Sequence, residues 1–332
     1  MEPCERDKGV RESHATKRAL GALTLLCLIL CVLLAGCGKS GAADGGSGQA
    51  ASNSQAATDT WQSVETERVS MTASYTTREL WVQNGDLKIY GIAYVPDDSE
   101  KAPLAVFSHE LGNDHTSGER YAERLAQSGY AVYVFDFCGG TVGGNRSDGS
   151  NAEMSVLTEA SDLEAVLRAA RTWDFVDADR IVLMGGSMGG LVTTIVGSSH
   201  QDKIAGMILI YPALSVKEDS KTSSYRTERD VPDDVSLFGG WIHVGKNFIT
   251  DLWKIDFDQL LTSYKGRMLL LHGDKDATVP ISWSEDAAKI IPTCEFHMIE
   301  GGGHKFFGQP FEDAMSYILA YLNNQLRVGN SE

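Results

Sequence analysis

The sequence predicts an α/β fold in which helices cover both faces of a mostly parallel sheet. Short apolar runs typical of buried parallel strands alternate with segments whose apolar residues recur every three or four positions. The predicted strands are 87–95, 104–108, 130–135, 180–184, 204–211, 268–272 and 295–299, and the predicted helices are 119–128, 154–171 and 311–326. Functional loops of such a sheet lie at the carboxyl ends of its strands.

A serine lies at the junction between one of these strands and a predicted helical segment. The apolar strand 180–184 leads into Gly-Gly-Ser-Met-Gly at residues 185–189, and an apolar helical segment follows at 191–196. Glycines suit a strained turn in which a side chain would collide with the neighbouring strand and helix. The five-residue pattern is common by chance, but this setting makes Ser187 a candidate nucleophile.

Two later segments offer the partners that a nucleophilic serine needs. Asp274 and Asp276 both follow the strand 268–272, and a glycine-rich segment after the strand 295–299 ends at His304. An imidazole can take the proton of the serine, and a carboxylate on its other nitrogen holds the imidazole in the correct tautomer. Either aspartate could be that carboxylate.

The order of Ser187, Asp276 and His304 resembles that of the α/β-hydrolase superfamily. The resemblance covers about 80–326 and includes the Gly-x-Ser-x-Gly turn, an acid in a Gly-x-x-Asp-x-x-Val-Pro segment and a late Gly-His. It implies the α/β-hydrolase fold, with Ser187 as nucleophile, Asp276 as acid and His304 as base. It favours Asp276 over Asp274 and implies no cofactor and no metal.

The same resemblance implies an oxyanion hole made of two backbone N–H groups, one from the residue after the nucleophile and one from the loop after the third strand. By position these groups belong to Met188 and Leu111. The loop 105–113 is similar to the His-Gly-x-x-Gly loop of the family, but Glu110 replaces the first glycine. One such donor typically stabilises the transition state by about 2.7–4 kcal/mol.

The polar loop at 136–149, together with 153–155, resembles bacterial hydrolases related to cinnamoyl and short-chain acyl esterases. This resemblance implies a serine esterase that cleaves a small carboxylic ester, of short-chain acyl or hydroxycinnamoyl type, through an acyl-enzyme. A peptidase similar to the catalytic domain of prolyl oligopeptidases and a thioesterase remain alternatives. So does an envelope-tethered binding protein on a non-catalytic hydrolase scaffold.

About fifty residues without a clear period separate two of the core strands. A structureless loop of that length is unusual in a compact domain, so a small lid is expected at about 214–265. Apolar residues at mainly helical spacing fill its second half: Phe238, Trp241, Val244, Phe248, Ile249, Leu252 and Trp253. They could seat the lid on the core, line a substrate pocket over Ser187, or do both. The expected substrate contacts are Phe238, Trp241, Phe248 and Trp253.

The amino terminus has the pattern of an export signal. Lys17 and Arg18 precede an apolar run at 19–35, and Leu-Ala-Gly-Cys at 34–37 resembles the bacterial lipoprotein box. The resemblance implies a signal peptide at 1–36 and a lipidated Cys37 that anchors the protein to the cell membrane, facing outside the cytoplasm. An uncleaved membrane anchor is the alternative.

The next segment, 37–60, is rich in small and polar residues and is expected to be a flexible linker, which leaves 61–332 as the hydrolase domain. The formal net charge of -16 disfavours nucleic acid as a partner. Beyond Cys37 only Cys138 and Cys294 remain; they could pair, but both are expected to be buried small side chains. The sequence does not define the oligomeric state.

Overall fold

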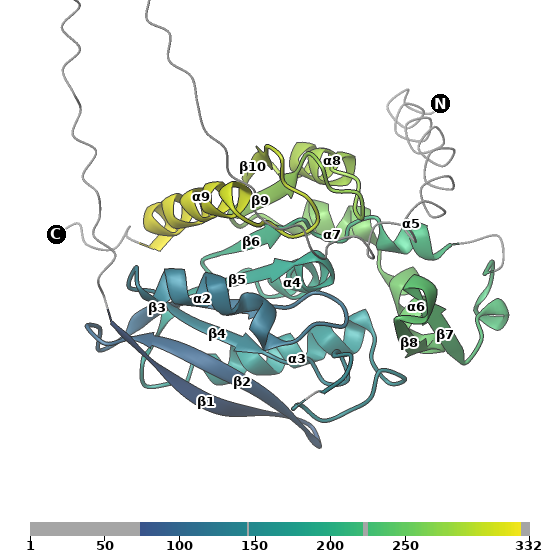
Figure 1. Cartoon of the computed structure of the whole chain (residues 1–332), viewed down its shortest axis with the longest axis horizontal. Helices are drawn as coiled ribbons and strands as arrows, with labels where there is room; N and C mark the ends of the chain where they lie inside the picture. The colour runs from purple at the N-terminus through teal and green to yellow at the C-terminus, as the bar shows by residue number, and fades with distance from the viewer. Residues whose placement is uncertain (1–73, 145, 222–224, 327–332) are drawn as a thin grey trace, which may run out of the picture. The chain divides into compact units, whose positions relative to one another are not determined.

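The computed structural model describes residues 74–144, 146–221 and 225–326 of the chain (Figure 1). The expected signal peptide, Cys37 and the linker lie outside the described residues. Within the described part, no helix combines the length and the apolar character that a membrane span requires.

Eight strands form the central sheet in the order β1-β2-β4-β3-β5-β6-β9-β10. The strands are β1 Tyr75–Asn84, β2 Leu87–Pro96, β3 Ala102–Ser108, β4 Ala131–Phe135, β5 Val176–Gly186, β6 Gly206–Ile210, β9 Met268–Gly273 and β10 Cys294–Ile299. Pairing is antiparallel from β1 to β4 and parallel from β4 to β10. The predicted fold class is confirmed. β1 is not among the predicted strands, because it is an edge strand with mostly exposed residues and little apolar pattern.

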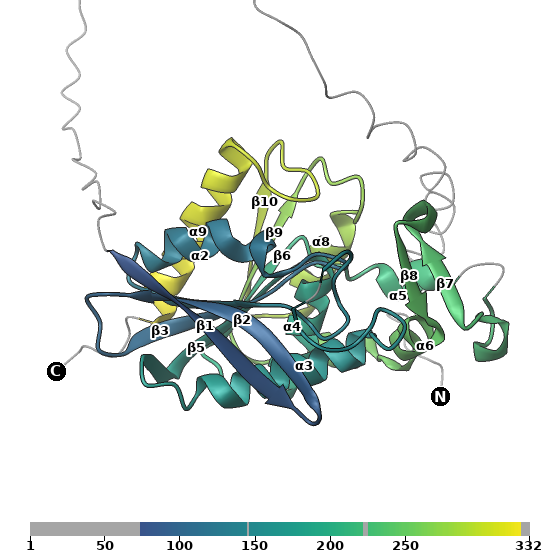
Figure 2. The ribbon, with the colours of Figure 1, turned by 60° about the horizontal axis from the view of Figure 1, so that its bottom comes forward.

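Helices cover both faces of this sheet (Figures 1 and 2). On one face α2 (Glu119–Ala126) and α9 (Gln309–Leu326) enclose a buried apolar cluster that includes Leu125 and Ile318. A second cluster, which includes Leu163 and Leu191, lies under α3 (Val156–Ala170), α4 (Ser187–Ser199) and α8 (Ser282–Ile290). A short 3₁₀ helix, η1 (His115–Gly118), precedes α2. The sheet lies between these two clusters.

The segment between β6 and β9, here called the insertion (residues 214–265), has secondary structure of its own. It contains α5 Val216–Ser220, η2 Glu228–Asp230, β7 Asp234–Leu237, η3 Phe238–Gly240, β8 Ile242–Gly245, α6 Lys246–Lys254 and α7 Phe257–Ser263. Figures 1 and 2 both show β7, β8, α5 and α6 together at one end of the described fold.

The helical spacing expected through the second half of the insertion is wrong for its first residues. β7 and β8 form a separate antiparallel hairpin whose turn includes the short η3, and in this half of the insertion α-helix begins only at Lys246. Gly239 and Gly240 have φ values of 68° and 93°, a left-handed conformation that reverses the chain between the two strands. The spacing of three between Phe238 and Trp241 therefore spans a hairpin turn.

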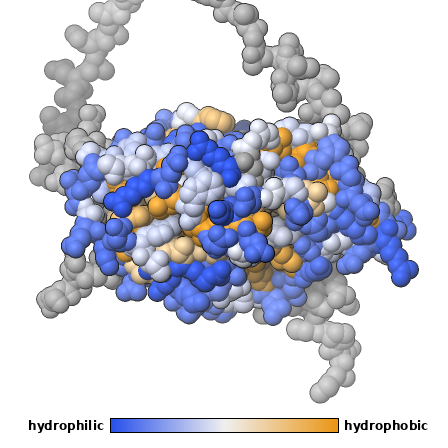
Figure 3. Space-filling view, turned by 90° about the horizontal axis from the view of Figure 1, so that it is seen from below, coloured by the Kyte–Doolittle hydropathy of each residue, from blue (hydrophilic) through white to orange (hydrophobic). Residues whose placement is uncertain are grey.

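The surface is mainly hydrophilic, in keeping with the charge of the chain. On the face drawn in Figure 3, hydrophilic residues cover most of the periphery and apolar residues gather in short patches. The exposed large apolar side chains include Phe238 and Trp241 of the insertion, which are 67% and 49% exposed. Cys138 is buried and Cys294 half-buried, and neither forms a disulfide.

Candidate active site

Ser187 occupies a strained turn between β5 and α4. Its φ of 50° lies in the left-handed region, which is unfavourable for a residue with a Cβ atom. A Cβ atom on Gly185 would lie 2.3 Å from the carbonyl oxygen of Gly189, and one on Gly189 would lie 2.2 Å from that of Ser108. The turn can therefore pack against the end of β3 only with glycines at both positions.

The structure brings Ser187, His304 and Asp276 into one hydrogen-bonded chain. The Nε2 atom of His304 lies 3.0 Å from Oγ of Ser187, and its Nδ1 atom lies 2.8 Å from Oδ2 of Asp276. An ionised carboxylate can only accept a hydrogen bond, so Nδ1 carries the proton and the lone pair of Nε2 faces the hydroxyl. This is the tautomer that general-base action at Ser187 requires.

The side chain of Asp276 is fully buried, and its carboxylate is surrounded by donors. Its Oδ1 atom accepts the N–H groups of Thr278 and Val279, at 2.8 and 2.9 Å. Burial alone would raise the pKa of Asp276, but hydrogen bonds from His272 and His304 outweigh it and hold the pKa well below its usual range. The carboxylate is therefore ionised at neutral pH.

His272 is a member of this network that the sequence analysis did not single out. Its Nε2 atom lies 3.2 Å from Oδ2 of Asp276 and 2.9 Å from the carbonyl oxygen of Val279, and its Nδ1 atom is 2.7 Å from Oγ of Ser284. Ser284 can donate to Nδ1, so the Nε2–H group of His272 faces the carboxylate. The available signal was a histidine at the end of β9, four residues before the acid.

Asp274 lies in a different environment. Its carboxylate pairs with Lys275 at 2.8 Å and accepts the N–H of Gly301 at 2.6 Å. This bond ties the loop after β9 to the loop after β10. The structure thus places Asp276, and not Asp274, against His304.

Two backbone N–H groups flank Ser187. Ser108, at the end of β3, pairs with Gly185, which brings the loop that contains Leu111 beside the serine turn. Met188 lies in the first turn of α4, where backbone N–H groups have no acceptor within the helix, and the Leu111 N–H has no backbone acceptor among the described loop residues. Both are available to a ligand.

The peptide group between Glu110 and Leu111 is held from its carbonyl side. The Glu110 carbonyl accepts from Nδ1 of His109 at 2.8 Å and from the N–H of Asn113 at 3.1 Å. Burial lowers the pKa of His109, and its Nε2 atom accepts the N–H of Phe137, so the ring is neutral with its proton on Nδ1. Because a trans peptide is planar, fixing this carbonyl also fixes the direction of the Leu111 N–H.

The four aromatic residues predicted to contact the substrate separate into two pairs. A Cβ atom on Gly112 would lie 2.4 Å from the ring of Trp241, so this ring packs on the Leu111 loop, and the ring of Phe238 lies 6.1 Å from it. Phe248 is 2% exposed in the apolar core, and Nε1 of Trp253 donates to Oγ of Ser220. Of these four residues, only Phe238 and Trp241 are exposed near the loop that contains Leu111.

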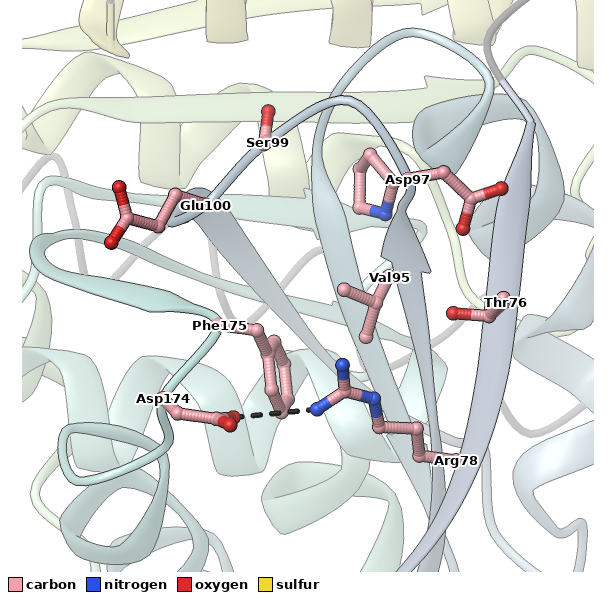
Figure 4. A pocket seen from close by; sticks show the side chains of 9 residues that line it. Thr76, Arg78, Val95, Asp97, Ser99, Glu100, Asp174 and Phe175 are labelled. Carbon is pink, nitrogen blue, oxygen red and sulfur yellow. Dashed lines mark hydrogen bonds and ion pairs between the residues drawn. The ribbon is translucent and has the colours of Figure 1, made fainter.

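A hollow of about 390 Å³ lies elsewhere, between β1, the end of β2 and the start of β5 (Figure 4). Arg78 bonds Asp174 there at 3.3 Å and lies over the ring of Phe175. None of Ser187, His304 and Asp276 lines this hollow. It is separate from the candidate active site.

An eight-stranded, mostly parallel sheet with a strained serine between strand and helix defines the α/β-hydrolase class. The family model described as "Serine aminopeptidase, S33" matches residues 99–236, a stretch that contains Ser187 but ends before Asp276 and His304. The chain thus has the α/β-hydrolase fold, and part of it matches a family of serine hydrolases.

Relatives of this chain include enzymes and proteins of several kinds. Monoacylglycerol lipase of Mycolicibacterium smegmatis is 22% identical, over 72% of this chain and 95% of its own length. The quorum-quenching protein AidA of Acinetobacter baumannii is 29% identical over 32% of this chain, and the match spans only 34% of that relative. The structure of Est1E from Butyrivibrio proteoclasticus with ferulic acid bound has a TM-score of 0.67 at 22% identity, and covers 75% of this chain and 99% of Est1E.

Proposed function

We propose that this protein is a serine esterase that cleaves carboxylic esters of short-chain acyl or hydroxycinnamoyl type. The observation that carries the proposal is the hydrogen-bonded chain from Ser187 through His304 to the buried, ionised Asp276. The ferulic acid bound to Est1E and the lipase among the relatives support an ester as the substrate class.

In the proposed reaction, Nε2 of His304 takes the proton of Ser187 while Oγ attacks the ester carbonyl carbon. The N–H groups of Leu111 and Met188 donate to the oxyanion that forms. Asp276 stabilises the imidazolium, which then gives its proton to the departing alcohol. Water, deprotonated by His304, releases the acid from the acyl-enzyme and Ser187 recovers its proton.

The insertion contributes substrate contacts in this proposal. We infer that Phe238 and Trp241 act as part of a lid over Ser187, since both are exposed and Trp241 packs on the Leu111 loop. Phe248 and Trp253 are packed inside the fold and seat the insertion on the core.

A fluorophosphonate probe and p-nitrophenyl acetate and butyrate test the esterase proposal. The wild type should label and turn over, and Ser187→Ala should lose labelling and at least ~10³-fold of kcat without unfolding. Ser199→Ala, at the exposed end of the same helix, is the matched control and should behave as wild type. An unlabelled wild type would instead favour a non-catalytic binding protein.

A peptidase is the second candidate, because the matching family model describes serine aminopeptidases. The same acyl groups presented as p-nitrophenyl esters, thioesters and p-nitroanilides separate the possibilities. An esterase should hydrolyse the anilides at least ~10²-fold more slowly than the esters. Faster cleavage of amino-acyl anilides would identify a peptidase.

We also propose that Cys37 carries a lipid that anchors the protein to the cell membrane, facing outside the cytoplasm. Support comes from the lipoprotein-box resemblance at 34–37 alone. Metabolic labelling with an alkyne fatty acid should mark the full chain expressed in a bacterium, and Cys37→Ala should abolish the label. Equal labelling of the variant would contradict the assignment.

A further inference from the structure

Glu110 departs from the loop pattern of the superfamily, and its side chain turns inward. The residue is 5% exposed, and its Oε1 atom accepts the hydroxyl of Tyr211 at 3.1 Å. Its Oε2 atom has no hydrogen-bond partner among the described residues. Burying a carboxyl group with one partner is costly, so its presence beside a reactive serine calls for a physical reason.

Tyr211 connects this carboxyl group to the candidate base. It follows β6, has a φ of 38° in the left-handed region, and is 1% exposed. Its ring centroid lies 4.9 Å from that of His304 and 5.0 Å from that of Phe306. Burial, followed by the nearby Tyr121 and Glu110, raises the pKa of Tyr211, so its hydroxyl stays protonated and donates to Glu110.

The same pair borders the serine turn. A Cβ atom on Gly186 would lie 3.1 Å from Oε1 of Glu110 and 3.3 Å from the ring of Tyr211. The N–H of Ala213, two residues beyond Tyr211, donates to the carbonyl of Ser187 at 2.9 Å. The pair thus lies against the serine turn and, through the ring of Tyr211, against His304.

We propose that the Glu110–Tyr211 hydrogen bond positions the Leu111 N–H and the His304 imidazole for reaction at Ser187. Glu110 acts through its own backbone, since its carbonyl belongs to the peptide group that carries the Leu111 N–H. Tyr211 acts through its ring, which supports one side of His304. Neither side chain touches the substrate, so both are positioning residues. The inference rests on the proposed esterase function.

Single substitutions at the pair test this role. Tyr211→Phe leaves the carboxyl group of Glu110 buried without a partner, and Glu110→Ala does the same to the hydroxyl of Tyr211. Each should lower kcat for p-nitrophenyl butyrate by about 10- to 100-fold, because small misplacements of catalytic groups are that costly, while KM changes by less than ~3-fold. Glu110→Gln keeps the acceptor oxygen and should recover most of the loss.

Tyr321→Phe is the matched control. The hydroxyl of Tyr321 is also buried, and it donates to the carbonyl of Arg267 at 2.9 Å, at the opposite end of the sheet. Both tyrosine variants should lower the thermal midpoint, but only Tyr211→Phe should lower kcat. A fall in kcat that is equal in both variants, or a fall that appears in KM alone, would overturn the positioning role.

The double variant Glu110→Ala/Tyr211→Phe removes both polar partners together. Its loss in kcat should be smaller than the product of the two single losses, because neither group is then left unpaired. Losses that simply multiply would also overturn the proposal. Fluorophosphonate labelling of the wild type separates this failure from failure of the esterase function, which would abolish labelling altogether.

Discussion

The loops around Ser187 and the insertion differ in how completely their side chains are held. The side chains of Asp276 and His272 are fully buried, and each of their polar atoms has a partner within 3.2 Å. In the insertion, Phe238 and Trp241 project from a hairpin and remain largely exposed. In the proposed esterase reaction, we therefore expect the loops to control the rate and the insertion to control which ester is accepted.

Asp276→Asn should have the largest effect, and it tests the comparison where a side chain is held most completely. The amide would favour the wrong tautomer of His304, so kcat should fall by about 10⁴-fold. Asp274→Asn keeps an oxygen for the N–H of Gly301 and should stay within ~5-fold of wild type. Steady-state kinetics on p-nitrophenyl acetate measures both, and a reversed ranking would mean that the acid lies at Asp274.

Glycine substitutions compare the backbone of the two regions. Gly189→Ala places a Cβ atom 2.2 Å from the carbonyl of Ser108 and must displace the serine turn, so kcat should fall by about 10²-fold. Gly239→Ala meets nothing within 4 Å, and its left-handed φ should cost about 1 kcal/mol of stability with little change in kcat. Kinetics and denaturant unfolding of both variants test this. An active Gly189→Ala enzyme would show that the turn is not sterically locked.

Within the insertion, Trp241→Ala should change substrate preference more than stability. Loss of its ring should alter the ratio of kcat/KM between butyrate and feruloyl esters by about 10-fold, the size of a modest pocket change. Phe248→Ala is the contrasting variant, because its buried ring should cost about 3–5 kcal/mol of unfolding free energy. An ester panel and urea unfolding distinguish the two. If Trp241→Ala keeps the wild-type ester preference, the insertion does not select the substrate.

The sequence was most informative where backbone sterics leave few choices. Apolar runs located the parallel strands, and the glycines at 185 and 189 located Ser187, because the turn tolerates no other residue there. The spacing before Val279 separated Asp276 from Asp274, and the structure places Asp276 beside His304.

Other features depend on contacts between distant segments. The hydrogen bond between Glu110 and Tyr211 joins loops that are about a hundred residues apart in sequence, and no local sequence pattern predicts it. The apolar spacing at 238–244 predicts a helix and the structure has a hairpin there, because three- and four-residue intervals also occur across a turn. The edge strand β1 carries too few buried side chains to show a period.

The smallest predicted effect concerns His115, which lies just beyond the Leu111 loop. Its Nδ1 atom is 2.6 Å from Oδ1 of the buried Asp136, and this hydrogen bond raises the pKa of His115. A pKa raised on folding stabilises the protein below the unfolded value of about 6.5, and the stabilisation is lost as the pH rises through the folded value.

His115→Asn should therefore cost stability at pH 5.5, by roughly 1 kcal/mol, and cost less at pH 8.5. The control is wild type unfolded in urea across the same pH range, with kcat followed in parallel. If the difference in unfolding free energy between wild type and His115→Asn grows with pH, His115 is held neutral and the loop is organised by packing alone. If this difference in unfolding free energy shrinks as the pH rises, charge on His115 helps to hold the segment that carries Leu111. The firmly held loops around Ser187 then extend to η1.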